Sequence, residues 1–166
     1  MYSKKISFDY QILQLTAKFY DDYPNPPYKE ILKKESRPYN CLLIQSHYGY
    51  FICIPYRSHI KHKYAYKFKN STRSKKTHSG LDYSKIVIIA KSEYIGTSEA
   101  IIDRDEYKET RENIEYIRND VQKYIDDYIA SISGDTITYD KIKFNRIYEY
   151  STLPYFHNEL GISAIK

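Results

Sequence analysis

Two apolar runs lie almost end to end in YNCLLIQSHYGYFICIPY, residues 39–56. The runs at 39–45 and 48–56 predict two strands, and Ser46 and His47 between them, with Gly49 nearby, predict a hairpin or a tight bulged turn. A third apolar run at 84–90 predicts another strand. Because all three runs are apolar on both faces, we expect them in the interior of a sheet rather than at its edge.

The sequence before these strands predicts further elements. Lys4–Phe8 predicts a short opening strand. From Asp9 to Tyr20, apolar residues recur at three- and four-residue spacing, which predicts a helix capped by Asp9. The prolines of Tyr23–Pro27 must end this helix. Tyr28–Ser36 is expected to form a loop or one short helix.

The later sequence predicts one exposed strand and two helices. Tyrosine and phenylalanine alternate with lysine over Lys63–Lys69, which is typical of a half-exposed strand. Asn70–Gly80 is polar and is predicted to be a flexible loop. Asp105–Ile132 carries an apolar stripe with charged residues on the other face, so a long helix is expected there, with Gly134 ending it. A last helix is predicted over Tyr139–Tyr150.

Length and composition favour one domain, residues 1–166, because single domains commonly have about 100–200 residues. The predicted class is α+β: a mostly antiparallel sheet with helices from both ends of the chain packed around it. No run approaches the roughly 18–20 apolar residues of a membrane helix, and the N-terminus lacks a signal-peptide pattern. A cytoplasmic protein without a membrane partner is therefore expected. Cys41 and Cys53 lie in apolar runs and are expected to be free and buried.

Charge is concentrated in one block of the chain. Residues 40–90 carry nine Lys and Arg residues and one acidic residue, whereas residues 92–140 carry thirteen acids and five bases. The basic block is also rich in tyrosine. Cations can contact phosphates and aromatic faces can stack on bases, so the block favours RNA or another nucleic acid as a partner. The alternative is a solvated lysine surface that pairs with the acidic helix later in the chain.

The segment that most suggests chemistry is IPYRSHIKH, residues 54–62. It places a hydroxyl, cations and two imidazoles where an apolar strand ends, and the end of a strand on a rigid sheet suits catalytic groups. The block offers Asp82 as its one carboxylate, which is too few acids for most metal sites. No metal or other cofactor is therefore expected.

Known hydrolase patterns are absent from the segment. There is no Gly-x-Ser-x-Gly turn, no carboxylate pair for two metals and no glycine-rich phosphate loop. Metal-free RNA cleavage remains. In this reaction the ribose 2′-hydroxyl attacks its own phosphate, so a protein need only orient the groups, move two protons and stabilise the charge that develops.

YFICIPYRSHIKH (50–62) and SGLDYSKIVII (79–89) resemble the toxins of type III toxin–antitoxin systems, the ToxN, AbiQ, TenpN and CptN group, with the CptN branch the most similar. The resemblance extends over most of the chain, including residues 6–10, 37–44 and 116–118. It implies a compact, strongly twisted, barrel-like sheet related to MazF-like toxins. It also implies a metal-independent endoribonuclease that leaves 2′,3′-cyclic phosphate and 5′-hydroxyl ends.

The same resemblance implies the partners. The antitoxin would be a small pseudoknotted RNA repeat, which the toxin cuts from a precursor and then binds in a closed protein–RNA assembly. Cellular mRNA would be the substrate, and no DNA partner is expected. The setting would be defence against phage, or plasmid maintenance, in the cytoplasm of a bacterium.

By position, the resemblance implies that Ser58 is the active-site hydroxyl, Lys61 the active-site lysine, and Tyr10 a tyrosine early in the first helix. The ToxN loop reads Thr-Ser-Pro-Lys, so the lysine of this chain is shifted by one position. It stays open whether Lys61, His59 or Arg57 contacts the scissile phosphate, and which group is the base. The expected RNA-binding residues are Arg37, His62, Lys63, Lys67, Lys69, Arg73, Lys75, Lys76 and Lys85.

Two other functions fit the same pattern. One is a non-catalytic RNA-binding module whose Ser58 loop is inert. The other is a MazF-type toxin that a protein neutralises. A short tandem repeat directly upstream of the coding region is required by the type III hypothesis alone, whereas an upstream protein-coding frame would favour the MazF type.

Overall fold

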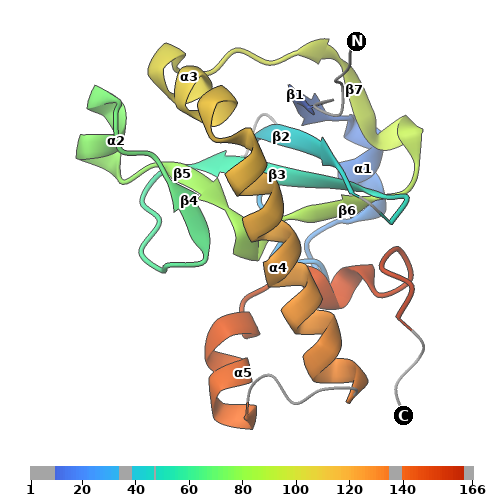
Figure 1. The fold of residues 1–166 in the computed structure, drawn as a ribbon. Helices are drawn as coiled ribbons and strands as arrows, with labels where there is room; N and C mark the ends of the chain where they lie inside the picture. Colours follow the sequence, from blue (N-terminus) through green and yellow to red (C-terminus); the bar gives the residue numbers. More distant parts are fainter. Residues whose placement is uncertain (1–9, 34–38, 47, 135–139, 163–166) are drawn as a thin grey trace, which may run out of the picture.

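The computed structural model describes residues 10–33, 39–46, 48–134 and 140–162. These residues form an α+β fold in which seven strands share one sheet and a long helix, α4 (Ile114–Ser133), lies across it (Figure 1). The predicted fold class is confirmed. None of the helices in the described ranges combines the length and the apolar character needed to span a membrane.

Every pairing of described strands is antiparallel. The order across the sheet is β4 (Ala65–Lys67), β5 (Gly80–Asp82), β3 (Phe51–Arg57), β2 (Asn40–Gln45), β1 (Tyr10–Leu15) and β7 (Ile95–Glu99). The remaining strand, β6 (Val87–Ile89), pairs with β3 outside this path. Since β4 and β7 end the order with one partner each, the described sheet is open, whereas the resemblance implied a barrel-like core.

Within the described residues, five helices and three short 3-10 turns connect and cover the strands. Besides α4 they are α1 (Ala17–Asp22), α2 (Thr72–Thr77), α3 (Arg104–Glu112), α5 (Lys141–Tyr148), η2 (Tyr83–Lys85), η3 (Ser92–Tyr94) and η4 (Leu153–Phe156). The apolar stripe of α4, which includes Ile117, Val121 and Ile125, is fully buried. Gly134 ends α4 in the left-handed region, with φ 75°, as predicted.

The two apolar runs form the predicted hairpin at the centre of the sheet. β2 pairs with β3 in a register that places Cys41 opposite Pro55 and Ile44 opposite Ile52. β3 is also flanked by β5 and β6, so both of its edges are paired, and the consecutive residues Ile52, Cys53 and Ile54 are buried, so both of its faces are covered. Cys41 and Cys53 are free and buried, as expected.

The predicted helix from Asp9 to Tyr20 is wrong. Tyr10–Leu15 forms β1, and only Ala17–Asp22 is helical. β1 lies between β2 and β7 and buries Ile12, Leu13 and Leu15, so its apolar residues do not alternate and their spacing imitates that of a helix. The predicted opening strand at Lys4–Phe8 lies outside the described residues.

Two further segments differ from expectation. The polar segment at 70–80 contains α2, because the Ser71 side chain accepts a hydrogen bond from the Ser74 N–H and caps the helix. The long helix expected over 105–132 is two helices, since Asn113, with φ −118°, separates α3 from α4. Asp103 caps α3 by accepting from the N–H groups of Asp105 and Glu106. The break lets α3 take a direction of its own (Figure 1), and the side chains of Glu106 and Glu109 on α3 accept hydrogen bonds from Arg73 of α2 and Tyr66 of β4.

Gly80 lets β4 approach β5 closely. It is buried opposite Arg57 on one side and Lys67 on the other, and a Cβ atom at this position would overlap the carbonyl oxygen of Tyr66. Because backbone atoms would have to move, we expect Gly80→Ala to lower the free energy of unfolding by about 1–3 kcal/mol. Urea denaturation measures this, and an unchanged midpoint would show that β4 moves without cost.

Candidate functional site

The loop after β3 brings four of the predicted site residues together and is fixed to α2. The N–H of His59 donates to the carbonyl of Thr77 at 2.6 Å, and the N–H of Ile60 donates to that of His78 at 3.2 Å. His59 and His78 both have positive φ values, 60° and 52°, which are uncommon outside glycine and mark tight turns here. The backbone of the loop therefore has a defined shape beside the last turn of α2.

Asp82 lies fully buried behind this loop and gathers several donors. Arg57 Nη1 donates to its Oδ2 at 2.8 Å, and His62 Nε2 lies 3.1 Å from its Oδ1. The hydroxyl and the N–H of Ser84 also donate to Oδ1, at 2.7 and 3.0 Å. Burial raises the pKa of Asp82, but hydrogen bonds from His62, Ser84 and Arg57 outweigh burial, so the pKa is lowered overall. The carboxylate is thus charged at neutral pH.

Both ring nitrogens of His62 are engaged inside the protein. Nδ1 accepts a hydrogen bond from the N–H of Tyr64 at 3.1 Å, and Nε2 faces Asp82 and the Ser84 hydroxyl, which is 3.3 Å away. This network assigns a hydrogen to Nε2. His62 was predicted to bind RNA, but its ring nitrogens instead join the loop to β5 and η2.

The Ser58 hydroxyl is held by a residue 15 positions later in the chain. Arg73 Nη2 donates to Ser58 Oγ at 2.7 Å, while Arg73 Nη1 donates to the two carboxylate oxygens of Glu106 at 3.0 and 2.8 Å. Glu106 is only 2% exposed and also accepts from Ser79 Oγ at 2.6 Å. Since Ser58 Oγ is the acceptor from Arg73, its own hydrogen can donate to an incoming oxygen.

His59 and Lys61 complete the loop with exposed side chains. Tyr10 does not join them: it lies in β1 rather than in a helix, and its electrostatic neighbours are Tyr107 and Arg111 of α3. Burial, with a smaller effect of Tyr107, raises the pKa of Tyr10. Arg37, the remaining residue placed by the resemblance, lies outside the described residues.

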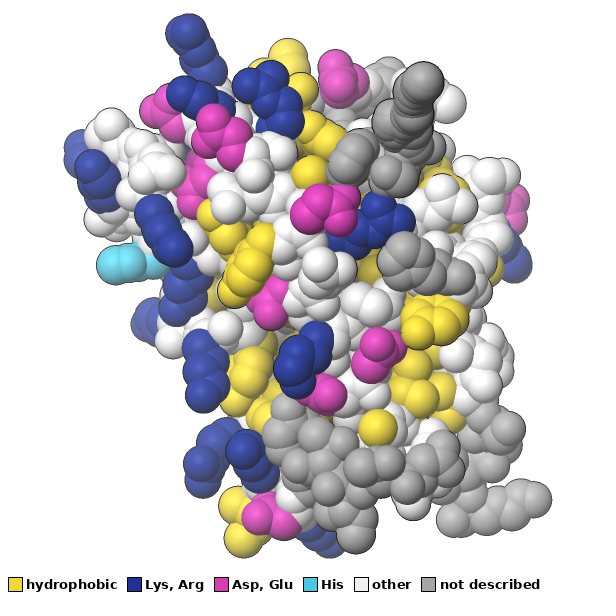
Figure 2. Space-filling model, viewed as in Figure 1, with side chains coloured by type: hydrophobic (Ala, Val, Ile, Leu, Met, Phe, Trp, Pro, Cys, Tyr) yellow, Lys and Arg dark blue, Asp and Glu magenta, His cyan; other side chains and the backbone are white. Residues whose placement is uncertain are grey.

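A basic groove runs between β4 and the start of α4. Its volume is about 430 Å³, and its lining is Lys63, Ala65, Tyr66, Lys67, Lys69, Asn113 and Tyr116. Tyr116 is 59% exposed, and its ring meets that of Tyr66 at 6.0 Å. Figure 2 shows Lys and Arg side chains along one edge of the molecule, from α2 past β4 to α5. The groove offers cations on one wall and an accessible aromatic face on the other.

The lysines of the groove keep their charge accessible because the acids of α3 are turned inward. Glu109 is 2% exposed and accepts from the Tyr66 hydroxyl and from the N–H groups of Lys69 and Asn70, at 2.8 to 3.1 Å. The prediction that the acids of this helix face solvent is wrong for Glu106 and Glu109. Among the described residues, Lys63, Lys67 and Lys69 form no ion pair, whereas Arg73 pairs with Glu106. The alternative of a basic surface that is neutralised by the acidic helix therefore describes Arg73 but not these three lysines.

One signal in the sequence does point to these buried acids. RDEYKETRE, the whole of α3, contains Tyr107 as its one large apolar residue, yet the helix needs an inward face. At spacings of three and four residues, that face consists of Glu106, Glu109 and Thr110, all buried. The Thr110 hydroxyl in turn lies 3.0 Å from that of Tyr56 on β3.

The remaining predicted RNA-binding residues divide into two groups. Lys75 and Lys76 are exposed on α2. The side chain of Lys85 is engaged within the protein, because its ammonium pairs with Glu30 and donates to the carbonyl of Tyr150. Within the described ranges, no three His, Cys, Asp or Glu side chains converge on a point where they could hold a metal ion.

Comparisons of this chain with protein-family models, with curated proteins and with solved structures gave no match. The chemistry of the site has to be judged from its own geometry.

Proposed function

We propose that this protein is a metal-independent endoribonuclease that acts as the toxin of a type III toxin–antitoxin system. The observation that carries the proposal is the Ser58–Arg73 donor pair, held by a buried carboxylate and linked through α3 to an open lysine groove. Glu106 and Glu109 lie on α3, and Asn113 follows Glu106 by seven residues at the C-terminal end of this helix, so the donor pair and the groove are about 10 Å apart along it. One RNA strand can span that length.

The proposed reaction uses the RNA itself as the nucleophile. The ribose 2′-oxygen attacks the adjacent phosphorus, the bond from phosphorus to the 5′-oxygen breaks, and the products carry a 2′,3′-cyclic phosphate and a 5′-hydroxyl. Ser58 and Arg73 would donate to the non-bridging oxygens as charge develops there. His59 and Lys61, the exposed titratable groups of the loop, are the candidates for moving the two protons and for adding positive charge.

In this proposal Arg57 has a structural role and does not contact the scissile phosphate. Its guanidinium is fixed by Asp82, so it shapes the loop that presents Ser58. Tyr10 is not assigned a proton-transfer role, because its neighbours are on α3. The partners follow from the resemblance: a pseudoknotted antitoxin RNA that occupies the groove in a closed protein–RNA assembly, and cellular mRNA as the substrate in a bacterial cytoplasm.

The test is cleavage of a cellular mRNA preparation by RNA-free refolded protein in excess EDTA, beside Ser58→Ala. We expect discrete cuts with 2′,3′-cyclic phosphate ends from the unmodified protein and strongly reduced cutting by the variant. Equal cutting by both would show that Ser58 is the wrong residue or that the activity is a contaminant.

A non-catalytic RNA-binding module is the second candidate, and one observation favours it. Apart from Lys63, the residues that line the groove, including Tyr116, lie outside the loop that carries Ser58, so most of the groove is independent of that loop. If neither protein cuts RNA in EDTA but both retain it, this candidate replaces the nuclease.

The groove lysines give a separate prediction. If Lys67 and Lys69 each contact one phosphate, their replacement by alanine is expected to weaken RNA binding and to reduce the slope of log K against log salt by about 0.7 per lysine, the value for single strands. Fluorescence anisotropy from 50 to about 300 mM salt measures both quantities. Lys108→Ala, an exposed lysine on α3, is the matched control and should leave the slope unchanged. An unchanged slope in the Lys67→Ala and Lys69→Ala proteins would contradict the assignment.

A further inference from the structure

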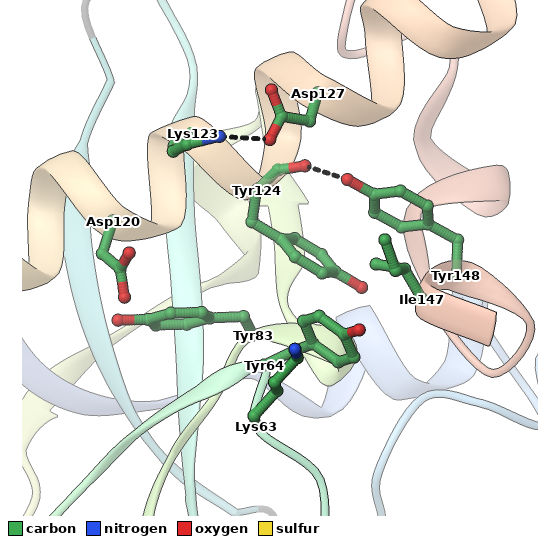
Figure 3. Close-up of a pocket in the computed structure, with 9 residues that line it drawn as sticks. All are labelled: Lys63, Tyr64, Tyr83, Asp120, Lys123, Tyr124, Asp127, Ile147 and Tyr148. Carbon is green, nitrogen blue, oxygen red and sulfur yellow. Dashed lines mark hydrogen bonds and ion pairs between the residues drawn. The ribbon is translucent and has the colours of Figure 1, made fainter. Parts of the chain in front are cut away.

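A smaller pocket continues the groove along α4. Lys63 lines both, and Asp120 of the pocket follows Tyr116 of the groove by four residues, so the two lie on one face of the helix about 6 Å apart. The pocket has a volume of about 140 Å³ and lies between η2, the segment before β4, α4 and α5 (Figure 3). The two hollows therefore form one path.

The pocket is built from aromatic rings. Tyr64, Tyr83 and Tyr148 surround Tyr124, at ring separations of 6.3, 6.3 and 4.9 Å. The hydroxyls of Tyr83 and Tyr124 are buried without a hydrogen bond of full geometry, and they interact with Asp120 and Ser151 of the protein. The rings therefore form the walls of the pocket.

Asp120 gives the pocket a directed acceptor. Figure 3 shows its carboxylate above the Tyr83 hydroxyl, and burial together with this negative charge raises the pKa of Tyr83. On the same helix, Lys123 and Asp127 neutralise one another at 2.6 Å. The remaining charges of the lining, one positive on Lys63 and one negative on Asp120, also sum to zero. The pocket thus suits neither a simple anion nor a simple cation, but a neutral ring that donates hydrogen bonds.

Size restricts the ligand further. A cavity of about 150 Å³ holds a single benzene ring. The pocket of about 140 Å³ therefore admits the six-membered ring and outer edge of a nucleobase, while a sugar and phosphate must stay in the groove beside Lys63. Aromatic walls and a polar edge are what an unstacked RNA base requires.

We infer that this pocket receives one base of the bound RNA strand and selects guanine, an inference that rests on the proposed function. The Watson–Crick edge of guanine presents two adjacent N–H donors, from N1 and the 2-amino group, which match the two oxygens of Asp120. Adenine, cytosine and uracil each place an acceptor beside their donor, so one carboxylate oxygen would face another acceptor.

The experiment uses 2′-fluoro oligouridines of five residues, which lack the attacking hydroxyl, with guanine, adenine or hypoxanthine at the centre. We expect the full-length protein to bind the guanine strand about ten-fold more tightly than the adenine strand, the order of one bidentate contact. Hypoxanthine keeps the N1 donor but lacks the 2-amino group and should lose most of the preference. Asp120→Asn should reduce it, whereas Asp126→Asn, the same change on the exposed face of α4, should keep it.

The outcomes separate this inference from the proposed function. Equal affinity for guanine and adenine strands, with binding still salt-dependent, overturns the base pocket and leaves the groove intact. Guanine and hypoxanthine strands of equal affinity overturn the two-donor assignment. Failure to bind any strand overturns both the pocket and the proposed function.

Discussion

Replacing Asp82 with Ala is expected to lower the free energy of unfolding by about 3–5 kcal/mol, the usual cost of removing one partner from a buried ion pair. Asp82 is fully buried and accepts from Arg57, His62 and Ser84. Its loss leaves the Arg57 guanidinium and the Ser84 hydroxyl without their acceptor. Urea denaturation at pH 7 measures the change. Asp21→Ala, an exposed acid on α1, is the matched control and should change stability by less than about 0.5 kcal/mol.

The same pair of proteins gives a pH test with a definite sign. The folded protein lowers the pKa of Asp82, because its hydrogen bonds outweigh burial. Its contribution to stability is therefore complete above the unfolded pKa of about 3.9 and is lost as the pH falls through the lower, folded value. The difference between wild type and Asp82→Ala should be constant from pH 7 to 5 and should shrink below about pH 4. A difference as small as that of Asp21→Ala at pH 7 would contradict the network.

Arg73→Ala is expected to slow RNA cleavage by about 10²–10³-fold, as when one preorganised donor to a developing oxyanion is removed. Arg73 holds the Ser58 hydroxyl and presents a side chain that is 42% exposed, so it can contact the phosphate directly. Single-turnover cleavage of one defined RNA in EDTA gives the rate. Arg104→Ala, an exposed arginine on α3, should cleave at the wild-type rate.

A double variant separates chemistry from folding. Arg73→Ala also leaves the buried Glu106 without its cation, so thermal unfolding of each variant must accompany the rates. If Ser58 and Arg73 act as one unit, the Ser58→Ala/Arg73→Ala protein should cleave about as slowly as the slower single variant. Multiplicative losses would show that the two residues act independently.

The central hairpin and the helix α4 could be predicted because the residues that form them are neighbours in sequence. Residues 39–56 contain both strands and their turn, and the stripe on α4 has the period of a helix. β1 could not be recognised in the same way. The adjacent residues Ile12 and Leu13 point to opposite faces of the sheet and both are buried, so the apolar residues of β1 do not alternate with polar ones. The spacing of apolar residues depends on which faces of a segment are buried. Here a strand that is buried on both faces has the same spacing as an amphipathic helix.

Only the part of the candidate site that consists of residues close together in the sequence could be predicted. Arg57 ends β3, and Ser58, His59 and Lys61 lie on the loop that follows it. The Ser58–Arg73 contact needed α2 to fold back over the loop, and the role of Glu106 needed α3 to turn its acids inward. These contacts join residues 15 and 33 positions apart, so no short pattern contains them.

The edge strand β4 has a consequence for association between copies of the chain. An exposed edge offers unpaired N–H and C=O groups to which a strand of another molecule can add. Here the edge is three residues long, Ala65–Lys67, and ends in an exposed lysine, with Lys63 and Lys69 on either side. A second copy that docked edge to edge would bring these like charges together. The lysines that are proposed to hold RNA should therefore also keep the protein monomeric and soluble at high concentration.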